Sequence, residues 1–198
     1  IYDGIGTGVN LKDLEKATTY YFAVFEYNVS ASGPDYLTAP AKFLIASQAT
    51  SSTPTKQVSN LNATNILSDR ATINFTVGDG SNRIFVMHEG APVDAEPTEF
   101  KTYWIGNTIY GNSLYQIGNG NYVVSYGNQS SFTVTGLKAG TEYYITAFEY
   151  NGSSAPVYLR PGAISHRFTT TGGVVIPTPS QAAHTPVRCA QQIGHDRD

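Results

Sequence analysis

The sequence predicts an all-β protein built on a Greek-key β-sandwich. Three observations support this prediction: the composition, a series of short apolar segments separated by turn signals, and the lack of helical periodicity over three turns. The 14 Tyr and the Thr residues favour strands, while the 19 Gly and the many Asn and Ser favour tight turns. Hydrophobic residues make up 40% of the chain, which is enough for a buried core, and charged residues only 14%.

Seven short strands are expected between residues 55 and 171. The most regular is 71–77, whose apolar residues at every second position share one face. A turn-forming loop, 78–82, separates it from the next apolar segment. Seven antiparallel strands of this length are typical of an immunoglobulin-like Greek-key sandwich. The expected strands are 57–64, 71–77, 83–88, 122–126, 131–135, 142–150 and 163–170.

An internal repeat organises the chain. Residues 14–28 match residues 137–151 at a fixed offset of 123, with eight of fifteen positions identical. The match extends upstream and, after a one-residue gap, downstream to Leu37 and Leu159. We therefore expect residues 1–47 to be the C-terminal half of a module whose front strands have no counterpart in this sequence, 48–54 to be a linker, and 55–171 to be one complete module. The tail, 172–198, has no strand pattern and is expected to be disordered or a linker.

Both copies carry the pattern of a tyrosine corner, in which a Tyr hydroxyl bonds to nearby backbone. The structural residues of the complete module are Leu137, Thr141 and Tyr143. Their counterparts in the first copy are Leu14, Thr18 and Tyr20. With this motif, the stretches 78–90, 115–152 and 156–163 resemble fibronectin type III domains, in a variant found in large secreted and surface proteins of Gram-negative bacteria.

The resemblance implies a sandwich fold and an extracellular or cell-surface location, and it leaves function open. Fibronectin type III domains usually carry a core Trp on the second strand, whereas the candidate position here is Phe75 and the only Trp is Trp104. We therefore expect a somewhat different core packing.

An insertion at about 90–121 accompanies an outward-facing row of aromatic residues. If Tyr143 points inward, Tyr144, Phe148 and Tyr150 point outward by the period of two. We expect the insertion to form an extra hairpin or an ordered loop. The insertion covers the row, or a neighbouring module packs on it, or the row stays open as a partner surface that stacks on a protein or a sugar. This candidate surface comprises Trp104, Tyr103, Tyr110, Tyr144, Phe148 and Tyr150.

Other polar patterns favour structural roles. The glycines of 4–8 precede a strand and not a helix, so they predict a turn and not a nucleotide site. Asp79 lies in a turn between two glycines. Glu26 and Glu149 occupy equivalent inward-leaning positions, where we expect a carboxylate that accepts backbone N–H bonds. The acidic residues near His88, which are Glu89, Asp94, Glu96 and Glu99, are expected in a solvated loop.

The leading functional hypothesis is a non-catalytic spacer or interaction module of a larger secreted or surface protein. The sequence contains no established nucleophile, zinc-protease or phosphate-loop motif, and the single Cys189 has no activating partner. We expect no enzyme activity, no cofactor and no metal.

The expected partners are neighbouring modules, a protein or a polysaccharide. Nucleic acid is not expected, because the net charge is −3 and basic residues do not cluster. No apolar run is long enough to span a bilayer. The alternative is a carbohydrate-binding module attached to a polysaccharide-acting enzyme.

Overall fold

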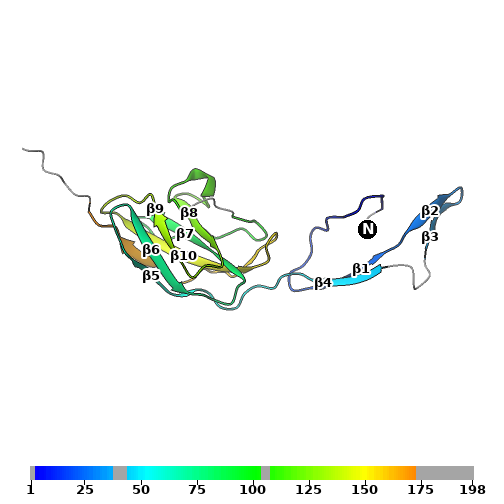
Figure 1. Ribbon diagram of the computed structural model, residues 1–198, viewed down its shortest axis with the longest axis horizontal. Helices are drawn as coiled ribbons and strands as arrows, with labels where there is room; N and C mark the ends of the chain where they lie inside the picture. The colour runs from blue at the N-terminus through cyan, green and yellow to red at the C-terminus, as the bar shows by residue number, and fades with distance from the viewer. Residues whose placement is uncertain (1–2, 38–43, 104–107, 173–198) are drawn as a thin grey trace, which may run out of the picture.

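The computed structural model describes residues 3–37, 44–103 and 108–172 (Figure 1). Within these ranges the chain forms strands, loops and one short 3-10 helix, so the predicted all-β class is confirmed. No helix in the described part is long and apolar enough to cross a membrane. The elements are β1 (Thr19–Val24), β2 (Tyr27–Ser30), β3 (Gly33–Tyr36), β4 (Leu44–Ala49), β5 (Ser59–Thr64), β6 (Arg70–Thr76), β7 (Asn82–Glu89), η1 (Ser113–Tyr115), β8 (Asn121–Gly127), β9 (Ser131–Thr135), β10 (Glu142–Asn151), β11 (Val157–Tyr158) and β12 (His166–Thr169).

Residues 55–171, here called the second repeat, form a two-sheet sandwich. One sheet has the order β5-β6-β9, and the other has the order β11-β10-β7-β8 with β12 also on β10. All ladders between these strands are antiparallel. The order interleaves strands from distant parts of the sequence, which is the signature of a Greek key.

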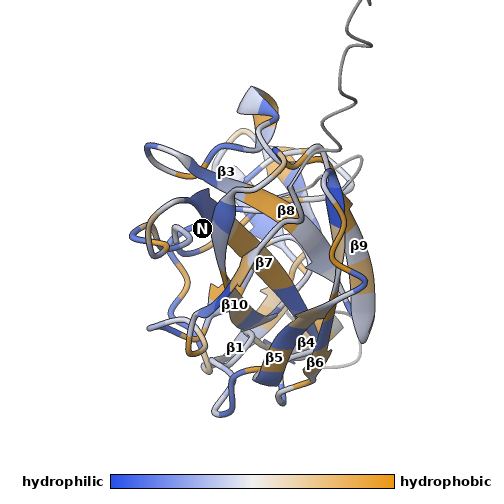
Figure 2. Ribbon diagram, turned by 90° about the vertical axis from the view of Figure 1, so that its left-hand side faces the viewer, coloured by the Kyte–Doolittle hydropathy of each residue, from blue (hydrophilic) through white to orange (hydrophobic). Residues whose placement is uncertain are grey.

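The main core lies between the two sheets, where the apolar strand faces meet (Figure 2). Ala71 and Ile73 of β6 face Phe85 and Met87 of β7, and all four are fully buried. Phe75, at the expected Trp position, packs its ring 4.5 Å from that of Phe85, measured between centroids. Two Phe rings thus pack together at the position for which the sequence predicted a core without Trp.

The strand boundaries differ from the predicted ranges mainly at the ends of the module. The first strand begins at Ser59, two residues after Gln57, whose side chain bonds to the Leu159 carbonyl and the Glu149 N–H. The last expected strand, 163–170, is shortened to β12, and β11 pairs with the far end of β10 on the same side. Pro161 lies between them and has no N–H to donate to a ladder.

Residues 1–47 are here called the first repeat, and their described part forms two separate two-stranded ladders. β1 pairs with β4, and β2 pairs with β3 in a hairpin. In Figure 1 these strands lie to one side of the sandwich, connected through residues 50–58. The division into a half module and a whole module stays a prediction. The predicted tail, 172–198, lies outside the described residues from 173 onward, so its expected disorder stays a prediction.

The described part of the insertion forms a loop that lies on the outer face of the larger sheet. Its described part contains only η1 and two isolated bridges, so the alternative of an extra hairpin is not observed there. Val93, Ala95, Tyr103, Tyr115 and Ile117 contribute to a second apolar cluster. The sheet contributes the buried residues Ile84, Val86, Val123, Phe148, Tyr150 and Tyr158 to the same cluster. The larger sheet is therefore covered on both faces.

Candidate interaction surfaces

The predicted aromatic partner surface is not one open face. Phe148 is 2% exposed and Tyr150 is 9% exposed, because the insertion packs over both rings. They therefore offer no surface to a partner in this conformation, which corrects their assignment to a binding face. Trp104 lies outside the described residues, so its position relative to the row is not part of the structure.

Tyr103 and Tyr144 remain partly accessible but are held in place. The Tyr103 ring packs edge-on against Tyr158 at 6.2 Å between centroids, and the Lys101 ammonium lies 5.0 Å above it. The Tyr144 hydroxyl donates to the carboxylate of Glu142 at 2.8 Å. These two side chains have the amphipathic character that suits a partner contact.

Tyr110 is separated from the rest of the predicted surface, on the edge of the main core. Its ring makes edge-on contacts with Tyr122 and Tyr143, each at 5.1 Å between centroids. It lines a cavity of about 370 Å³, the size of a small-molecule site. Besides Tyr110 and Tyr122, the lining contains His88, Glu89, Lys138 and three glycines.

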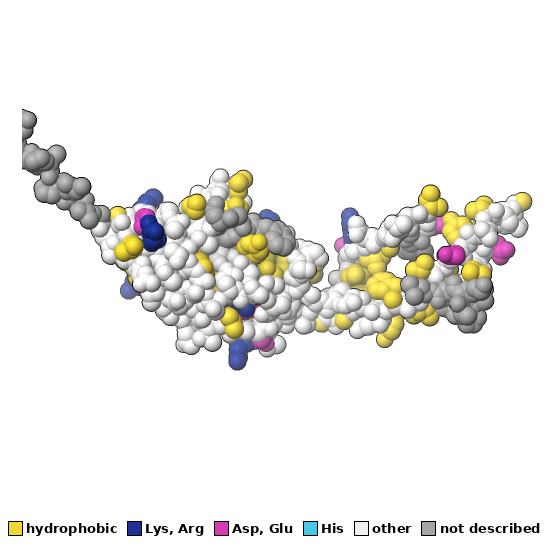
Figure 3. All heavy atoms as spheres, viewed as in Figure 1, with side chains coloured by type: hydrophobic (Ala, Val, Ile, Leu, Met, Phe, Trp, Pro, Cys, Tyr) yellow, Lys and Arg dark blue, Asp and Glu magenta, His cyan; other side chains and the backbone are white. Residues whose placement is uncertain are grey.

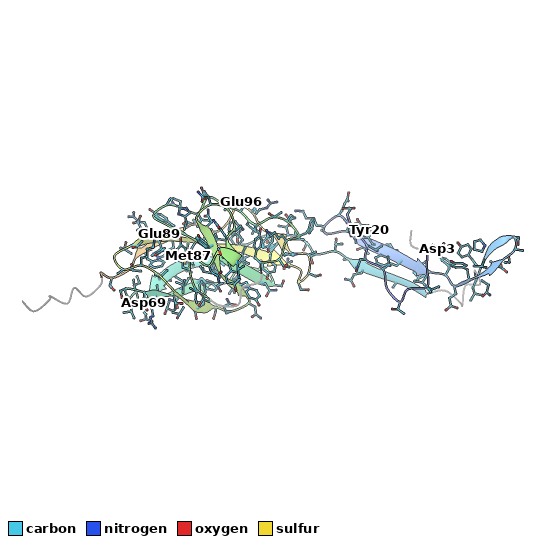
Figure 4. The ribbon with its side chains drawn as sticks, turned by 90° about the horizontal axis from the view of Figure 1, so that it is seen from above. Asp3, Tyr20, Asp69, Met87, Glu89 and Glu96 are labelled. Carbon is cyan, nitrogen blue, oxygen red and sulfur yellow. The ribbon has the colours of Figure 1, made fainter. Side chains whose placement is uncertain are left out.

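The polar groups of this cavity are fixed by one another. Lys138 Nζ lies 2.8 Å from Glu89 Oε1, and Nδ1 of His88 lies 2.8 Å from the Glu89 carbonyl oxygen. Burial raises the pKa of Tyr110, and the charge of Glu89 adds to the shift. Figure 4 labels Glu89 and the core residue Met87 on the same strand. Tyr rings beside donors and acceptors suit a polyhydroxylated ligand.

The expected tyrosine corner of the second repeat contains more bonds than the motif predicts. Tyr143 accepts a 2.9 Å bond from the Lys138 N–H. Thr170 completes the arrangement, because its hydroxyl accepts from the Thr141 N–H and donates to the Lys138 carbonyl. We call these bonds the corner network. Thr170 was not predicted, although an equivalent Thr50 follows the first copy of the motif.

Glu149 forms a buried ion pair that the sequence did not reveal. Its side chain is fully buried, and Oε1 accepts from Arg83 Nε at 2.9 Å and from the Gly78 N–H at 2.8 Å. The backbone bond expected for this carboxylate is thus present, together with a cation. Arg83 also donates to the Gln129 carbonyl. Each charge compensates for the desolvation of the other, so the pair fixes the register of β7 against β10.

Three of the four acidic residues near His88 make separate structural contacts, and Glu96 is exposed. Asp94 accepts from the Asn121 amide at 2.6 Å, and Glu99 accepts from the Tyr158 N–H and pairs with Arg160. Asp79 accepts from the Thr55 hydroxyl and the Lys56 N–H, which lowers the pKa of its carboxyl. Across the described ranges no three His, Cys, Asp or Glu residues gather as metal ligands.

A larger hollow, of about 720 Å³, lies where the two repeats meet. Leu11, Leu14 and Lys16 line it from the first repeat, and Phe100 and Val157 line it from the second. Leu14 is the counterpart of Leu137, which is buried in the main core. This hollow therefore includes the face of the first repeat that corresponds to a sandwich interior.

Comparison with known proteins gives distant structural likenesses to solved domains. No family model and no curated relative matches the chain. Among solved structures, the fibronectin type III domain of human fibronectin type III domain containing protein 3 is 17% identical, with 68% of this chain and 98% of that chain covered and a TM-score of 0.41. The FN5 domain of Drosophila Lar is 13% identical, with coverages of 61% and 99% and a TM-score of 0.38. Domains A168–A170 from titin are 10% identical, with coverages of 83% and 43% and a TM-score of 0.43.

Proposed function

We propose that this chain is a non-catalytic spacer and interaction segment of a larger secreted or surface protein. The second repeat is an antiparallel two-sheet sandwich of the immunoglobulin-like type, and domains of this kind commonly serve as such modules. The main support for the proposal is that the linker between the repeats is hydrogen-bonded to both of them. A spacer must set the distance and orientation of what it connects, which requires a short or restrained linker.

The linker is hydrogen-bonded from both sides. The Ser51 carbonyl accepts from the Ala17 N–H of the first repeat at 3.1 Å. The next residue, Ser52, accepts through its carbonyl from the Asn151 amide of the second repeat at 3.0 Å. Pro54 is buried, and Asp79 holds Thr55 and Lys56. Consecutive residues are thus held by different repeats, which leaves little free chain between them.

The test measures how widely the distance between the repeats varies. In a background with Cys189→Ser, spin labels at Val29→Cys and Ile164→Cys, both highly exposed, report this distance. We expect a narrow distribution, broadened by Asn151→Ala with Asp79→Ala and unchanged by the surface control Asn128→Ala. A distribution as broad in the parent as in the double variant contradicts a spacer that fixes orientation.

A second candidate function is carbohydrate binding at the cavity of Tyr110 and Tyr122. Its ring faces, carboxylate and ammonium group can each contact sugar hydroxyls or ring C–H groups. Titration with a panel of soluble oligosaccharides should shift the resonances of Tyr122 and His88. Lys138→Ala, at a side chain that is 70% exposed, should weaken that binding without unfolding the domain. If no oligosaccharide shifts these resonances, this candidate is wrong.

A further inference from the structure

The chain contains two Asn-Gly sequences, Asn119-Gly120 and Asn151-Gly152. An asparagine before a glycine is especially labile, because the glycine has no Cβ to hinder attack of its backbone nitrogen on the Asn side chain. The attack requires a side-chain amide that is free to rotate and a backbone that can bring the two groups together. The two sequences therefore differ in reactivity if the fold restrains them differently.

The fold restrains the side chain of Asn151 at both of its polar atoms. Its Oδ1 accepts from the Ser81 N–H at 2.9 Å, and its Nδ2 donates to the Ser52 carbonyl at 3.0 Å. Asn151 is also the last residue of β10 and pairs with Val157 of β11. Rotation of this side chain toward the Gly152 nitrogen would break both bonds, so the folded chain protects Asn151.

Asn119 lies in an exposed turn and lacks such restraints. The turn is closed by the Ile117 N–H, which donates to the Asn121 carbonyl at 2.9 Å. The Asn119 side chain is exposed and forms no hydrogen bond with another described residue. Both flanking glycines have positive φ, of 92° for Gly118 and 74° for Gly120. The side-chain amide and the Gly120 nitrogen can therefore meet without loss of a bond to the rest of the fold.

The carbonyl of Asn119 belongs to a set of bonds that holds the insertion. Nδ2 of Asn121, which is fully buried, donates to this carbonyl at 2.9 Å and to Asp94 Oδ1 at 2.6 Å. The Asp94 N–H donates in return to Asn121 Oδ1 at 3.4 Å. The main chain at Asn119 therefore determines where Asn121 holds the insertion.

The two glycines of the turn pack closely against the surrounding structure. A Cβ on Gly118 would lie 2.9 Å from the Ala95 Cβ. A Cβ on Gly120 would lie 2.7 Å from His88 Nε2. Ala95 packs on the cluster that buries Phe148, and the visible face of the sandwich in Figure 3 shows hydrophobic side chains in small groups. A longer main chain in this turn would therefore displace Ala95 from that cluster.

We propose that Asn119 is a site of spontaneous isoaspartate formation, and that the lengthened main chain loosens the insertion from the larger sheet. The product has one more methylene in the main chain than Asn119 has. It also carries a carboxylate in place of the carbonyl that Asn121 holds. This inference depends neither on the linker nor on sugar binding, so its failure would leave both functions unaffected.

The reaction needs only water and a base. The Gly120 nitrogen loses its proton to solvent and attacks the side-chain carbon of Asn119, which forms a C–N bond and closes a cyclic imide. The side-chain nitrogen takes up a proton and leaves as ammonia. Water then adds to the imide, and cleavage at the α-carbonyl gives isoaspartate, while cleavage at the other carbonyl gives aspartate.

The first test ages the full chain at mildly alkaline pH, which favours the deprotonated nitrogen, and maps its peptides by mass spectrometry. We expect loss of the unmodified Asn119 peptide, with isoaspartate and aspartate forms in its place, and retention of the Asn151 peptide. In urea both peptides should convert at similar rates, because unfolding breaks the bonds of Asn151. Equal conversion in the folded chain, or conversion of neither site, overturns the proposal.

The second test measures amide exchange of Asp94, with Ile145 of β10 as the internal reference. Exchange of Asp94 should become faster in the aged chain. It should not change in Asn119→Gln aged in the same way, because the longer side chain closes a ring far more slowly. Fresh Asn119→Asp has the added charge with a normal main chain and should match the unaged parent. Unchanged Asp94 exchange in the converted chain, or equal acceleration in fresh Asn119→Asp, overturns the role of the lengthened main chain.

Discussion

The two repeats carry the same corner network in two different environments. In the first repeat Tyr20 accepts from the Glu15 N–H at 2.8 Å, and Thr50 accepts from the Thr18 N–H at 3.0 Å. The corresponding bonds of Tyr143 and Thr170 in the second repeat are both 2.9 Å long. Tyr143 is fully buried, whereas Tyr20, labelled in Figure 4, is only partly buried. Local sequence therefore specifies the bonds, and burial determines how much they contribute to stability.

The largest expected difference between the repeats is the loss of stability when the equivalent carboxylates, Glu149 and Glu26, are each replaced. Glu149→Gln should lower the free energy of unfolding of the second repeat by about 3–5 kcal/mol, because it leaves Arg83 buried without its counter-ion. Glu26→Gln should change stability by less than about 0.5 kcal/mol, because that side chain is exposed. Urea denaturation followed by circular dichroism measures both variants. Similar losses in the two would show that the repeats do not differ in burial as described.

A smaller difference is expected at the tyrosine corners. Tyr143→Phe should cost about 1–3 kcal/mol, because the Lys138 N–H loses its acceptor in a buried environment. Tyr20→Phe should cost less than about 0.5 kcal/mol, since water can satisfy the Glu15 N–H. The urea midpoint reports the first variant, and amide exchange of Glu15 reports the second. A neutral Tyr143→Phe would contradict the role of burial in the corner network.

The smallest expected difference in stability between the repeats comes from the backbone conformation at Ala17 and Gly140, which precede the corner strands. Ala17 has φ of 54° where the second repeat has Gly140 with φ of 62°. A Cβ at Gly140 would meet only the Gly172 Cα at 3.9 Å, so Gly140→Ala should cost about 1 kcal/mol from conformation alone. Ala17→Gly should slow exchange in the first repeat modestly, because relief of strain exceeds the added chain entropy. Gly140→Ala should lower stability and Ala17→Gly should raise it. A change in the same direction for both variants would contradict this account.

The parts of the structure that follow from local periodicity could be predicted from the sequence. The alternation along β10, with Tyr143 inward and Phe148 outward, needs only the period of two. Whether Phe148 is open or covered depends on the insertion, which packs on it from far along the chain. The partnership of Glu149 with Arg83 likewise joins residues 66 positions apart. Such contacts depend on sheet topology, which a single sequence specifies only indirectly.

Gln57 has a mechanical consequence. Its amide donates to the carbonyls of Leu159 and Pro161, and its side-chain oxygen accepts from the Glu149 N–H. When the chain is pulled from its N-terminal side, tension enters the second repeat at Ser52, which Asn151 holds. It then passes the side-chain bonds of Asp79 and Gln57 before it reaches β5. Within the part of the chain that the structure describes, β5 pairs only with β6 and is an edge strand. These side-chain bonds therefore bear the load before the β5–β6 ladder does. The side-chain bonds of Asp79 and Gln57 must therefore break together before the pulling force reaches the β5–β6 ladder.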